Sequence, residues 1–287
     1  GTEGGAARLW PGPGGCGCRG WLMRLSLGWI LSYACLAGCA ALPGARRWGE
    51  DVTISPGWER VRAAAAEAVR DPWVWAPLAG AAGLQINSWD RQISSWAIRE
   101  SPIFGDPRSA ANWSDDLRSA AVLSHAVTVL LAPSGDDTHT WLVNKAKGYA
   151  LDMAAVGTAN GITHVLKMEV GRMRPSRNNT ESFPSGHTTS ATTFDRLAAR
   201  NLGYFDITAT TRRRITYGLD ALTIATAWAR VEAGAHYPSD TLFSMALGNF
   251  SANFFRNAFV ESEGGRTQEF AVMPVHDGLM LQYSASF

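Results

Sequence analysis

The spacing of apolar and polar residues predicts α-helices along most of the chain. Residues 56–71, PGWERVRAAAAEAVRD, are rich in strong helix formers and end just before Pro72. Trp89, Ile93 and Trp96 recur near helical spacing within residues 87–100, which is typical of one buried helix face. Further helices are predicted at 109–132, 138–173, 186–202, 209–230 and 238–260. The pattern therefore predicts an all-α fold, a helical bundle.

The C-terminal end of the chain has a different pattern. Within residues 263–287, the stretch EFAVMPVHDGLMLQYSASF alternates, and Asp277-Gly278 is a turn signal. We therefore expect a small β-hairpin there. The chain has 287 residues, of which 46% are hydrophobic, so residues 55–262 suffice for one well-packed helical domain.

Charge and hydropathy exclude some classes of partner. The formal net charge is +1, so nothing global favours nucleic acid. No apolar run reaches the roughly 18 residues that a spanning helix needs. We therefore expect the apolar helices to be buried against one another.

The N-terminal region resembles the leader of a bacterial lipoprotein. All four cysteines, at positions 16, 18, 35 and 39, fall in the first 39 residues. Arg24 is followed by an apolar stretch at 25–36 and then by small residues, as in a secretory signal. Leu36-Ala37-Gly38-Cys39 resembles a lipobox, in which the cysteine is acylated and becomes the mature N-terminus. The alternative is a plain apolar helix.

This interpretation sets the expected boundaries and location. Residues 1–38 are predicted to be an upstream extension and a signal peptide, because Met23 would make a conventional start and leaves 1–22 outside. The pair Cys16-x-Cys18 is then no metal site. Residues 39–54 are predicted to be a tether, and the acyl chains on Cys39 suffice for stable anchoring. The expected location is the bacterial cell envelope, on the outer membrane facing the periplasm.

Several polar residues interrupt the apolar helices. Lys167 and Arg174 in KMEVGRMRP are seven apart, so we expect both to project from one face of a single helix that Pro175 ends. In SFPSGHTTS, a Pro-Ser-Gly turn places His187 at the start of a predicted helix. Each feature alone has a structural interpretation, such as a solvated helix face.

A third segment, RVEAGAHYPSD, contains Arg230, His236 and Asp240. Pro238 is favoured at the first position of a helix, and Asp240 lies one turn from His236. Alone, this histidine and this carboxylate could form a surface ion pair.

In order along the chain, the three segments have the form Lys-x6-Arg-Pro, Pro-Ser-Gly-His and Arg-x5-His-x3-Asp. This series resembles the signature of the type-2 phosphatidic acid phosphatase superfamily, which includes bacterial acid phosphatases and vanadium haloperoxidases. The resemblance covers 167–240. Two features depart from the family pattern: Ala229 stands where many members have Ser, and the gap between the first two motifs is short.

The residue types suit phosphoryl transfer. A transferring phosphoryl group carries charge on three equatorial oxygens, and catalysis is mostly positioning and electrostatic stabilisation. Lys167, Arg174 and Arg230 supply three positive charges. Ser185 and Gly186 are expected to place backbone N–H groups at a helix N-terminus, where the dipole also favours an anion.

The resemblance implies a role for each remaining residue. His236 would be the nucleophile that forms a phosphohistidine, and Asp240 would accept its other ring N–H. His187 would protonate the leaving oxygen and later draw a proton from water. A zinc site built from these histidines is a weaker alternative, because three cations beside it would repel a metal. No cofactor is expected, and vanadate should inhibit.

The remaining histidines match no motif and are expected to be structural or solvated; they are His125, His139, His164 and His276. Of these, His164 lies one turn before Lys167 and could line the pocket. The run Thr211 to Arg214 is expected to be a solvated helix start.

The sequence thus predicts a metal-independent phosphatase that acts on phosphate monoesters or diphosphates, with a phosphorylated lipid favoured over a small soluble ester. The alternatives are a vanadate-dependent haloperoxidase, against which the short length argues, and a non-catalytic envelope lipoprotein, which would have no need for both histidines. The oligomeric state does not follow from the sequence.

Overall fold

The structure is a computed structural model that describes residues 46–260 in full and the backbone of 268–275 and 278–285. The chain divides into two units, 1–40 and 41–287, and the first lies outside the described residues, as do the predictions for the signal peptide and Cys39. The α-helices are α2 (Trp58–Arg70), α3 (Pro72–Gly83), α4 (Trp89–Glu100), α5 (Pro107–Leu131), α6 (Thr138–Val170), α7 (Gly186–Asn201), α8 (Ala209–Glu232) and α9 (Pro238–Phe259), with 3-10 turns η1 (Ile86–Ser88) and η2 (Leu202–Tyr204).

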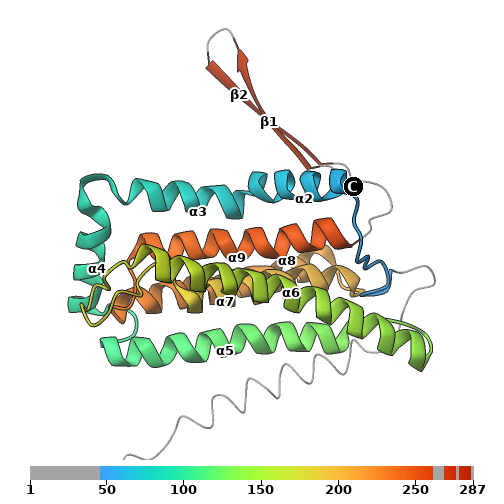
Figure 1. The fold of residues 1–287 in the computed structure, drawn as a ribbon, viewed down its shortest axis with the longest axis horizontal. Coiled ribbons are helices and arrows are strands. Elements are labelled where there is room, and N and C mark those ends of the chain that lie inside the picture. The colour runs from blue at the N-terminus through green and yellow to red at the C-terminus, as the bar shows by residue number, and fades with distance from the viewer. Residues whose placement is uncertain (1–45, 261–267, 276–277, 286–287) are drawn as a thin grey trace, which may run out of the picture. The chain divides into compact units, whose positions relative to one another are not determined.

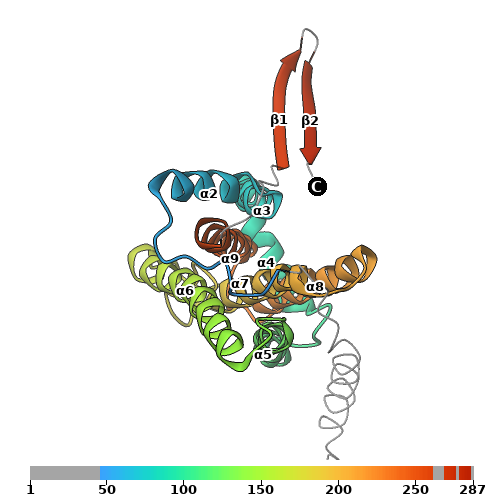
Figure 2. The same ribbon diagram turned by 90° about the vertical axis from the view of Figure 1, so that its right-hand side faces the viewer.

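The predicted all-α bundle is confirmed. Helices α7 and α9 form its centre: α7 packs against α5, α6, α8 and α9, and α9 also packs against α2, α3 and α6 (Figure 2). Gly248 on α9 allows this packing, because a Cβ there would lie 2.8 Å from the Cβ of Thr192 on α7. The second motif leads into α7, and the third runs from the end of α8 into the start of α9, so the packing of these helices brings the two motifs together.

The interior is built from small and polar side chains as much as from large apolar ones. One apolar cluster joins Ala155, Leu197 and Ala252 from α6, α7 and α9. Helix α7 also buries a run of hydroxyl side chains, and Thr192 and Thr193 donate to backbone carbonyls one turn earlier. Small side chains let the helix backbones approach, and the bonded hydroxyls avoid the cost of burying unpaired polar groups.

The segment expected to be a tether to residue 54 is folded from residue 46 onward, so that boundary was wrong. Trp48 is fully buried, its indole N–H donates to Asn201 at 2.8 Å, and its backbone N–H donates to the carbonyl of Pro133 at 2.7 Å. Thr53 donates its backbone N–H to Phe259. Large aromatic burial outweighs the Pro/Gly/Arg composition that suggested a tether.

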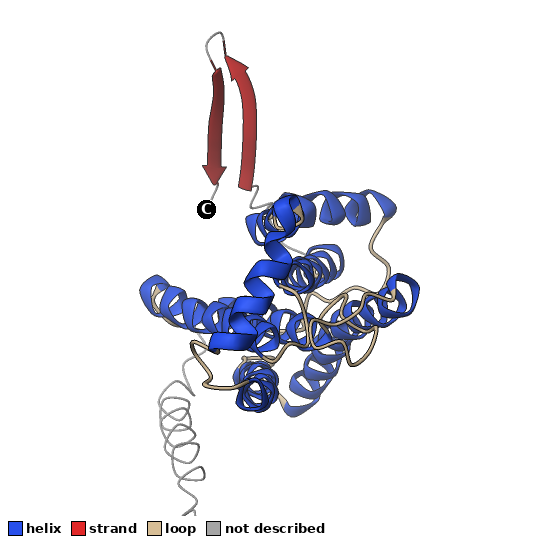
Figure 3. Ribbon diagram, turned by 90° about the vertical axis from the view of Figure 1, so that its left-hand side faces the viewer, coloured by secondary structure: helices blue, strands red, loops and turns tan. Residues whose placement is uncertain are grey.

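The C-terminal hairpin is also present. Strands β1 (Gln268–Val275) and β2 (Gly278–Ala285) pair antiparallel, with Phe270 opposite Tyr283 (Figure 3). Within the described part of the chain, no helix is both long and apolar enough to cross a bilayer.

Candidate active site

The three sequence motifs meet at one end of the bundle. The C-terminal end of α6, the loop 171–185, the N-terminal ends of α7 and α9 and the C-terminal end of α8 all lie there, together with α4 and the start of α5 (Figure 1, left). Segments that are distant in sequence therefore contribute to one site.

His236 is the most enclosed residue of the site, with 1% of its surface exposed. Its ring Nδ1 bonds the carbonyl oxygen of Ser182. Because a carbonyl only accepts, Nδ1 carries the proton and Nε2 keeps its lone pair. Burial, followed by the charges of Arg230, Lys167 and Arg174, holds the pKa of His236 well below its ordinary value. The ring is therefore neutral near pH 7 and has the form that a nucleophile needs.

Asp240 was predicted to accept the ring N–H of His236, and this contact was wrong. Its carboxylate accepts from the Ser182 hydroxyl, from the backbone N–H of Tyr237 at 2.9 Å and from the guanidinium of Arg172. Asp240 therefore acts on His236 indirectly, by fixing Ser182, whose carbonyl holds the ring. Burial raises the pKa of Asp240, and the hydrogen bond from Ser182 and the charge of Arg172 oppose that rise.

Arg172 connects two buried carboxylates, Asp90 on α4 and Asp240 on α9. Its two terminal nitrogens form ion pairs with them, at 2.6 Å to Asp90. The guanidinium also stacks over the ring of Tyr237, 4.2 Å from its centroid. Burial lowers the pKa of Arg172, but the two carboxylates outweigh it and the net shift is upward. Asp90 in turn accepts the backbone N–H and the hydroxyl of Ser239. This network ties α4 and the loop before α7 to the start of α9.

Lys167 and Arg174 reach the site from different elements, so the prediction that they share one helix face was wrong. Helix α6 ends at Val170, because Gly171 adopts φ 55° and turns the chain left-handed. Arg174 thus lies in the following loop, where its N–H donates to Asn179 at 3.0 Å.

Glu181 bridges the two cations of this first motif. Its backbone carbonyl accepts from Lys167 Nζ at 2.6 Å, and its exposed carboxylate lies 3.6 Å from Arg174. Burial lowers the pKa of Lys167, with a further contribution from the charge of Arg174, and Glu181 opposes the shift. Glu181 is the counter-ion that an anionic ligand would have to replace.

Arg230, near the end of α8, is buried and bonds the hydroxyl of Ser114 on α5 at 3.1 Å. Burial, followed by the nearby charge of Arg174, lowers its pKa to about 10, so it stays charged at neutral pH. The Nε atoms of Arg230, Arg174 and Arg118 are buried without a hydrogen-bond partner among the described residues. Three arginines with unpaired donors fit an anion with several oxygens, such as phosphate.

His187 lies in the first turn of α7, as predicted, and pairs with a residue that the sequence did not reveal. Its Nε2 is 2.6 Å from the Asp115 carboxylate on α5. Burial and the charges of Arg230 and Arg118 lower the pKa of His187, while Asp115 raises it. The histidine is thus held between two cations and one carboxylate.

The predicted helix N-terminus is present at α7, but only part of it is available to a ligand. Ser185 is the N-cap residue, and its hydroxyl accepts the N–H of Thr188. The backbone N–H of Ser185 donates to the hydroxyl of Ser244 at 2.7 Å, so its predicted use for phosphate was wrong in this arrangement. Gly186 and His187 are the first two helical residues, whose N–H groups have no intrahelical acceptor. The phosphate-binding role of Gly186 stays a prediction.

The other histidines lie outside this site. His125 is buried and pairs with Asp152 at 2.9 Å, which confirms a structural role. His139 starts α6, and His164 is exposed on the same helix. His276 lies outside the described residues. Among residues whose positions are described, no three His, Cys, Asp or Glu side chains form a metal-binding group.

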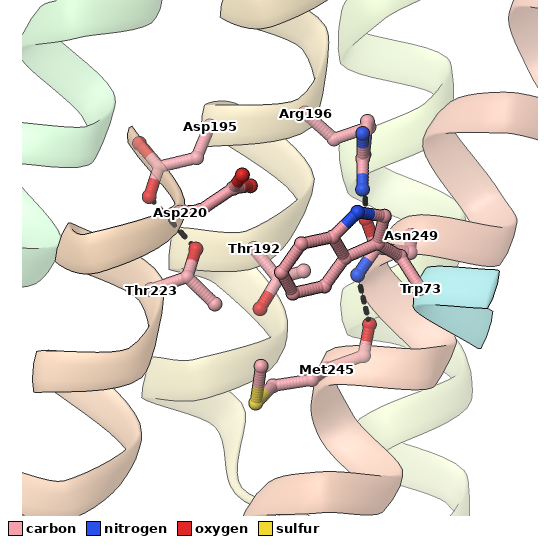
Figure 4. A pocket seen from close by; sticks show the side chains of 8 residues that line it. All are labelled: Trp73, Thr192, Asp195, Arg196, Asp220, Thr223, Met245 and Asn249. Carbon is pink, nitrogen blue, oxygen red and sulfur yellow. Dashed lines mark hydrogen bonds between the residues drawn. The ribbon is translucent and has the colours of Figure 1, made fainter. Parts of the chain in front are cut away.

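A second polar pocket is separate from the three motifs. It lies between α3, α7, α8 and α9, and its lining includes Asp195, Arg196, Asp220 and Thr223 (Figure 4). The Thr223 hydroxyl donates to one oxygen of Asp195, and the other oxygen is buried with no hydrogen-bond partner in the described part of the chain. Burial raises the pKa of Asp195 to about 8.

Sequence reasoning missed every residue that supports the motifs from outside them. Asp115 and Arg118 lie one turn apart on α5, and Asp90 opens α4. In the sequence they are ordinary polar residues of amphipathic helices. Arg172, which lies inside the first motif, was missed too. It had a usable signal, because it is two residues before Arg174 in an arginine-rich segment.

Comparisons with known proteins give one family match and one similar solved structure. Residues 149–263 match the PAP2 superfamily. None of the curated proteins matches the chain. A solved structure, that of a transmembrane PAP2-type phosphatidylglycerolphosphate phosphatase from Bacillus subtilis, is similar with a TM-score of 0.49 and 20% sequence identity, covering 64% of this chain and 92% of that one. The part of the chain that matches the PAP2 superfamily, residues 149–263, contains all three motifs.

Proposed function

We propose that this chain is a phosphatase that hydrolyses phosphate monoesters or diphosphates through a phosphohistidine on His236, with lipid phosphates as favoured substrates. One observation carries the proposal. A neutral, buried His236, held through Nδ1 so that Nε2 keeps its lone pair, is under the influence of three cations, Lys167, Arg174 and Arg230. A nucleophile surrounded by fixed positive charge suits attack on an anionic phosphoryl group.

In the first proposed step, Nε2 of His236 forms a bond to phosphorus while the bond from phosphorus to the leaving oxygen breaks. The leaving oxygen takes a proton from His187. Lys167, Arg174 and Arg230 stabilise the charge on the three equatorial oxygens, and the first N–H groups of α7 add to this. The positive charge that develops on the His236 ring is stabilised by the Ser182 carbonyl, which accepts the Nδ1 proton.

In the second proposed step, water attacks phosphorus and gives its proton to His187, now a base. The P–N bond breaks, its electron pair returns to Nε2, and inorganic phosphate leaves. His187 therefore needs a pKa that permits both proton states. Burial and two arginines lower this pKa, and Asp115 counters them. A bound phosphate dianion also favours the protonated imidazole, so the site recovers an acid when substrate binds.

The preference for lipids and the proposed location depend on the N-terminal sequence. An acylated Cys39 would hold the enzyme on the periplasmic face of the outer membrane, where phosphorylated lipids are within reach. Cys39→Ser should release the protein from the membrane fraction and leave hydrolysis of a soluble ester intact. A wild-type protein that carries no lipid on Cys39 would contradict the anchor and leave the catalytic proposal standing.

The catalytic proposal is tested with purified protein and an aryl phosphate. Turnover should persist in excess EDTA, because the proposed steps use only side chains, and vanadate should inhibit as a mimic of five-coordinate phosphorus. Quenching in alkaline denaturant during turnover should trap phosphate on His236, detectable by peptide mass spectrometry at alkaline pH, because the P–N bond of a phosphohistidine hydrolyses in acid. Activity that EDTA abolishes and that zinc or magnesium restores would overturn the mechanism.

A further inference from the structure

We propose that four exposed apolar side chains around the site, Ile103, Trp113, Met168 and Met173, form a surface that docks on a lipid bilayer. We call this set the apolar rim. The inference deepens the proposed function, on which its purpose rests, because docking would bring the headgroup phosphate of a lipid to His236 without extracting the lipid from the membrane.

The rim is interleaved with the site along the chain. Trp113 immediately precedes Ser114, which bonds Arg230. Met168 immediately follows Lys167, and Met173 lies between Arg172 and Arg174. Trp113, Met168 and Met173 are therefore each next in sequence to a residue of the site.

Ile103 is brought to the same place by hydrogen bonds from its loop. Glu232, two residues after Arg230, is fully buried and accepts the backbone N–H groups of Ile103 at 3.1 Å and Phe104 at 3.0 Å. The ring of Phe104 then packs against Trp113, with centroids 6.2 Å apart. The loop that carries Ile103 is thus fixed to the end of α8, next to the phosphate-binding cations.

These side chains are exposed to a degree that needs a partner. The exposed fractions are 66% for Ile103, 62% for Met168, 49% for Trp113 and 48% for Met173. Large apolar side chains are exposed elsewhere on the described helices too, and the four rim residues differ from them in lying beside cations of the site. Holding such side chains in water forgoes the free energy of burial.

Charge favours a bilayer as the partner. The rim lies beside Lys167, Arg174 and Arg230, which are positive, so the surface combines apolar contacts with affinity for an anion. The interface of a bilayer offers the same pair of features, acyl chains next to anionic phosphates. Tryptophan suits this boundary, because its ring is apolar and its N–H is polar.

The chain offers matched controls at the opposite end of the same two helices. Leu130 near the C-terminal end of α5 is 69% exposed, and Leu142 near the N-terminal end of α6 is 60% exposed. They resemble Ile103 and Met168 in size, apolarity and exposure and differ in distance from the site. Helix α6 therefore carries one test position, 168, and one control, 142, while test position 103 lies in the loop before α5 and control 130 lies on α5.

The first experiment asks which face meets lipid. In the full chain with all four native cysteines replaced by Ser, so that no acyl chain is attached, a single Cys is introduced at 103, 168, 130 or 142 and labelled with a polarity-sensitive fluorophore. Vesicles of phosphatidylcholine and phosphatidylglycerol, which contain no phosphate monoester, are then added. We expect a blue shift, and quenching by spin-labelled lipid, at 103 and 168 only. No change at these positions, or equal changes at all four, would overturn the proposal.

The second experiment uses the double variant Ile103→Ser/Met168→Gln, with Leu130→Ser/Leu142→Gln as its control. The rim variant should bind vesicles roughly 10-fold or more weakly, as expected for two apolar side chains that leave a lipid interface. Its ratio of kcat/KM for a vesicle-borne lipid phosphate to that for a soluble ester should fall similarly. The control should leave both unchanged.

Two outcomes separate this inference from the proposed function. Docking through positions 103 and 168 without hydrolysis of any phosphate ester would support the rim and contradict the phosphatase. If the rim variant changes the sedimentation coefficient and leaves vesicle binding intact, the rim is a contact between copies of this chain and the bilayer proposal fails.

Discussion

The carbonyl oxygen of Ser182 accepts the Nδ1 proton of His236, and the hydroxyl of the same serine donates to Asp240. One residue thus transmits the carboxylate's position to the ring while the carboxylate stays out of direct contact. A carbonyl carries less negative charge than a carboxylate, so it fixes the tautomer and leaves the imidazole less basic. This arrangement suits a nucleophile that must remain neutral among three cations.

The two histidines should respond differently to the leaving group. His236→Ala removes the nucleophile, so turnover of every substrate should cease and an alkaline quench should trap no phosphoenzyme. His187→Ala removes the general acid, so hydrolysis of an alkyl phosphate should fall roughly 10²–10⁴-fold. A nitrophenyl phosphate leaves without a proton, so its first step should be less affected and phosphoenzyme should accumulate. Steady-state and quenched-flow kinetics measure both effects. Equal losses with both leaving groups and no trapped intermediate would mean that the roles are reversed.

Asp115 should control the pH dependence of the reaction. Burial and nearby arginines place the pKa of His187 below its ordinary value, so kcat/KM should fall on the alkaline side of an acidic optimum. Asp115 raises this pKa, so Asp115→Asn should lower it further and move the alkaline limb to lower pH. The profile is measured with one soluble ester throughout.

The control for this prediction is Asp116→Asn, at the exposed neighbouring position on α5. It changes the net charge by the same amount and lies one residue away from the histidine's partner. Because substrate ionisation is common to both variants, only a difference between them reports on His187. Identical shifts in the two variants would exclude a specific role for Asp115.

Arg172→Met should reduce both stability and activity. The change leaves Asp90 and Asp240 buried without their cation, which typically costs 3–5 kcal/mol; we expect about 3 kcal/mol, because Arg172 is partly exposed. Loss of the brace on Asp240 should displace Ser182 and lower kcat roughly 10- to 100-fold. Urea denaturation and kinetics measure the two effects. The control Arg91→Met, at an exposed position on α4, should change neither the unfolding free energy nor kcat. An Arg172→Met variant that is stable but inactive would instead show that Arg172 has a direct catalytic role.

Asp195 should make the fold less stable as the pH rises. Its pKa is about 8 in the native state, against about 3.9 for an unfolded Asp, so between these values the native state holds a proton that the unfolded state has lost. Unfolding free energy should therefore fall with rising pH in this range, by up to about 1.4 kcal/mol per pH unit for one proton.

Asp195→Asn should remove this dependence. The amide is uncharged and still accepts the hydroxyl of Thr223, so the variant should be more stable than wild type near pH 8 and similar near pH 4. Chemical denaturation across this range measures the difference, with the exposed Asp206→Asn as control. Parallel curves for wild type and Asp195→Asn would show that the carboxyl is ionised in the native state.

The helices were predictable because each has a local cause. Pro72 and Pro133 predicted that a helix ends shortly before each of them. In the structure, α2 ends at Arg70 and α5 at Leu131. The end of α6 was misplaced by three residues, because the sequence analysis took Pro175 as the end signal whereas Gly171 ends the helix earlier. Its left-handed conformation moves Arg174 into a loop, which spacing alone could not reveal.

The structure brings the motif residues to one end of the bundle, and their pairings did not follow from the sequence. The motif spacing predicts roles for Lys167, Arg174, His187, Arg230 and His236, because phosphate chemistry restricts these residue types strongly, and these roles stay predictions. Hydrogen bonds between distant elements, such as His187 to Asp115, depend on how α5 packs against α7 and leave no periodic signal. Likewise, the family resemblance implied the contact of Asp240 with His236, whereas in the structure Ser182 from another segment bonds both residues.

The burial of Trp48 limits how far the enzyme could travel from its anchor. If Cys39 carries the acyl chains, nine residues separate it from the fixed indole, a leash of at most about 32 Å. Trp48 packs close to Gly148, and Lys167 lies 19 residues further along α6, about 28 Å at 1.5 Å per residue. The fully extended segment from Cys39 to Trp48 would then be only slightly longer than the distance along α6 from Gly148 to Lys167. Such an enzyme would act only on lipids close to its own anchor, because the few residues between Cys39 and Trp48 limit how far the site can move from the acylated cysteine.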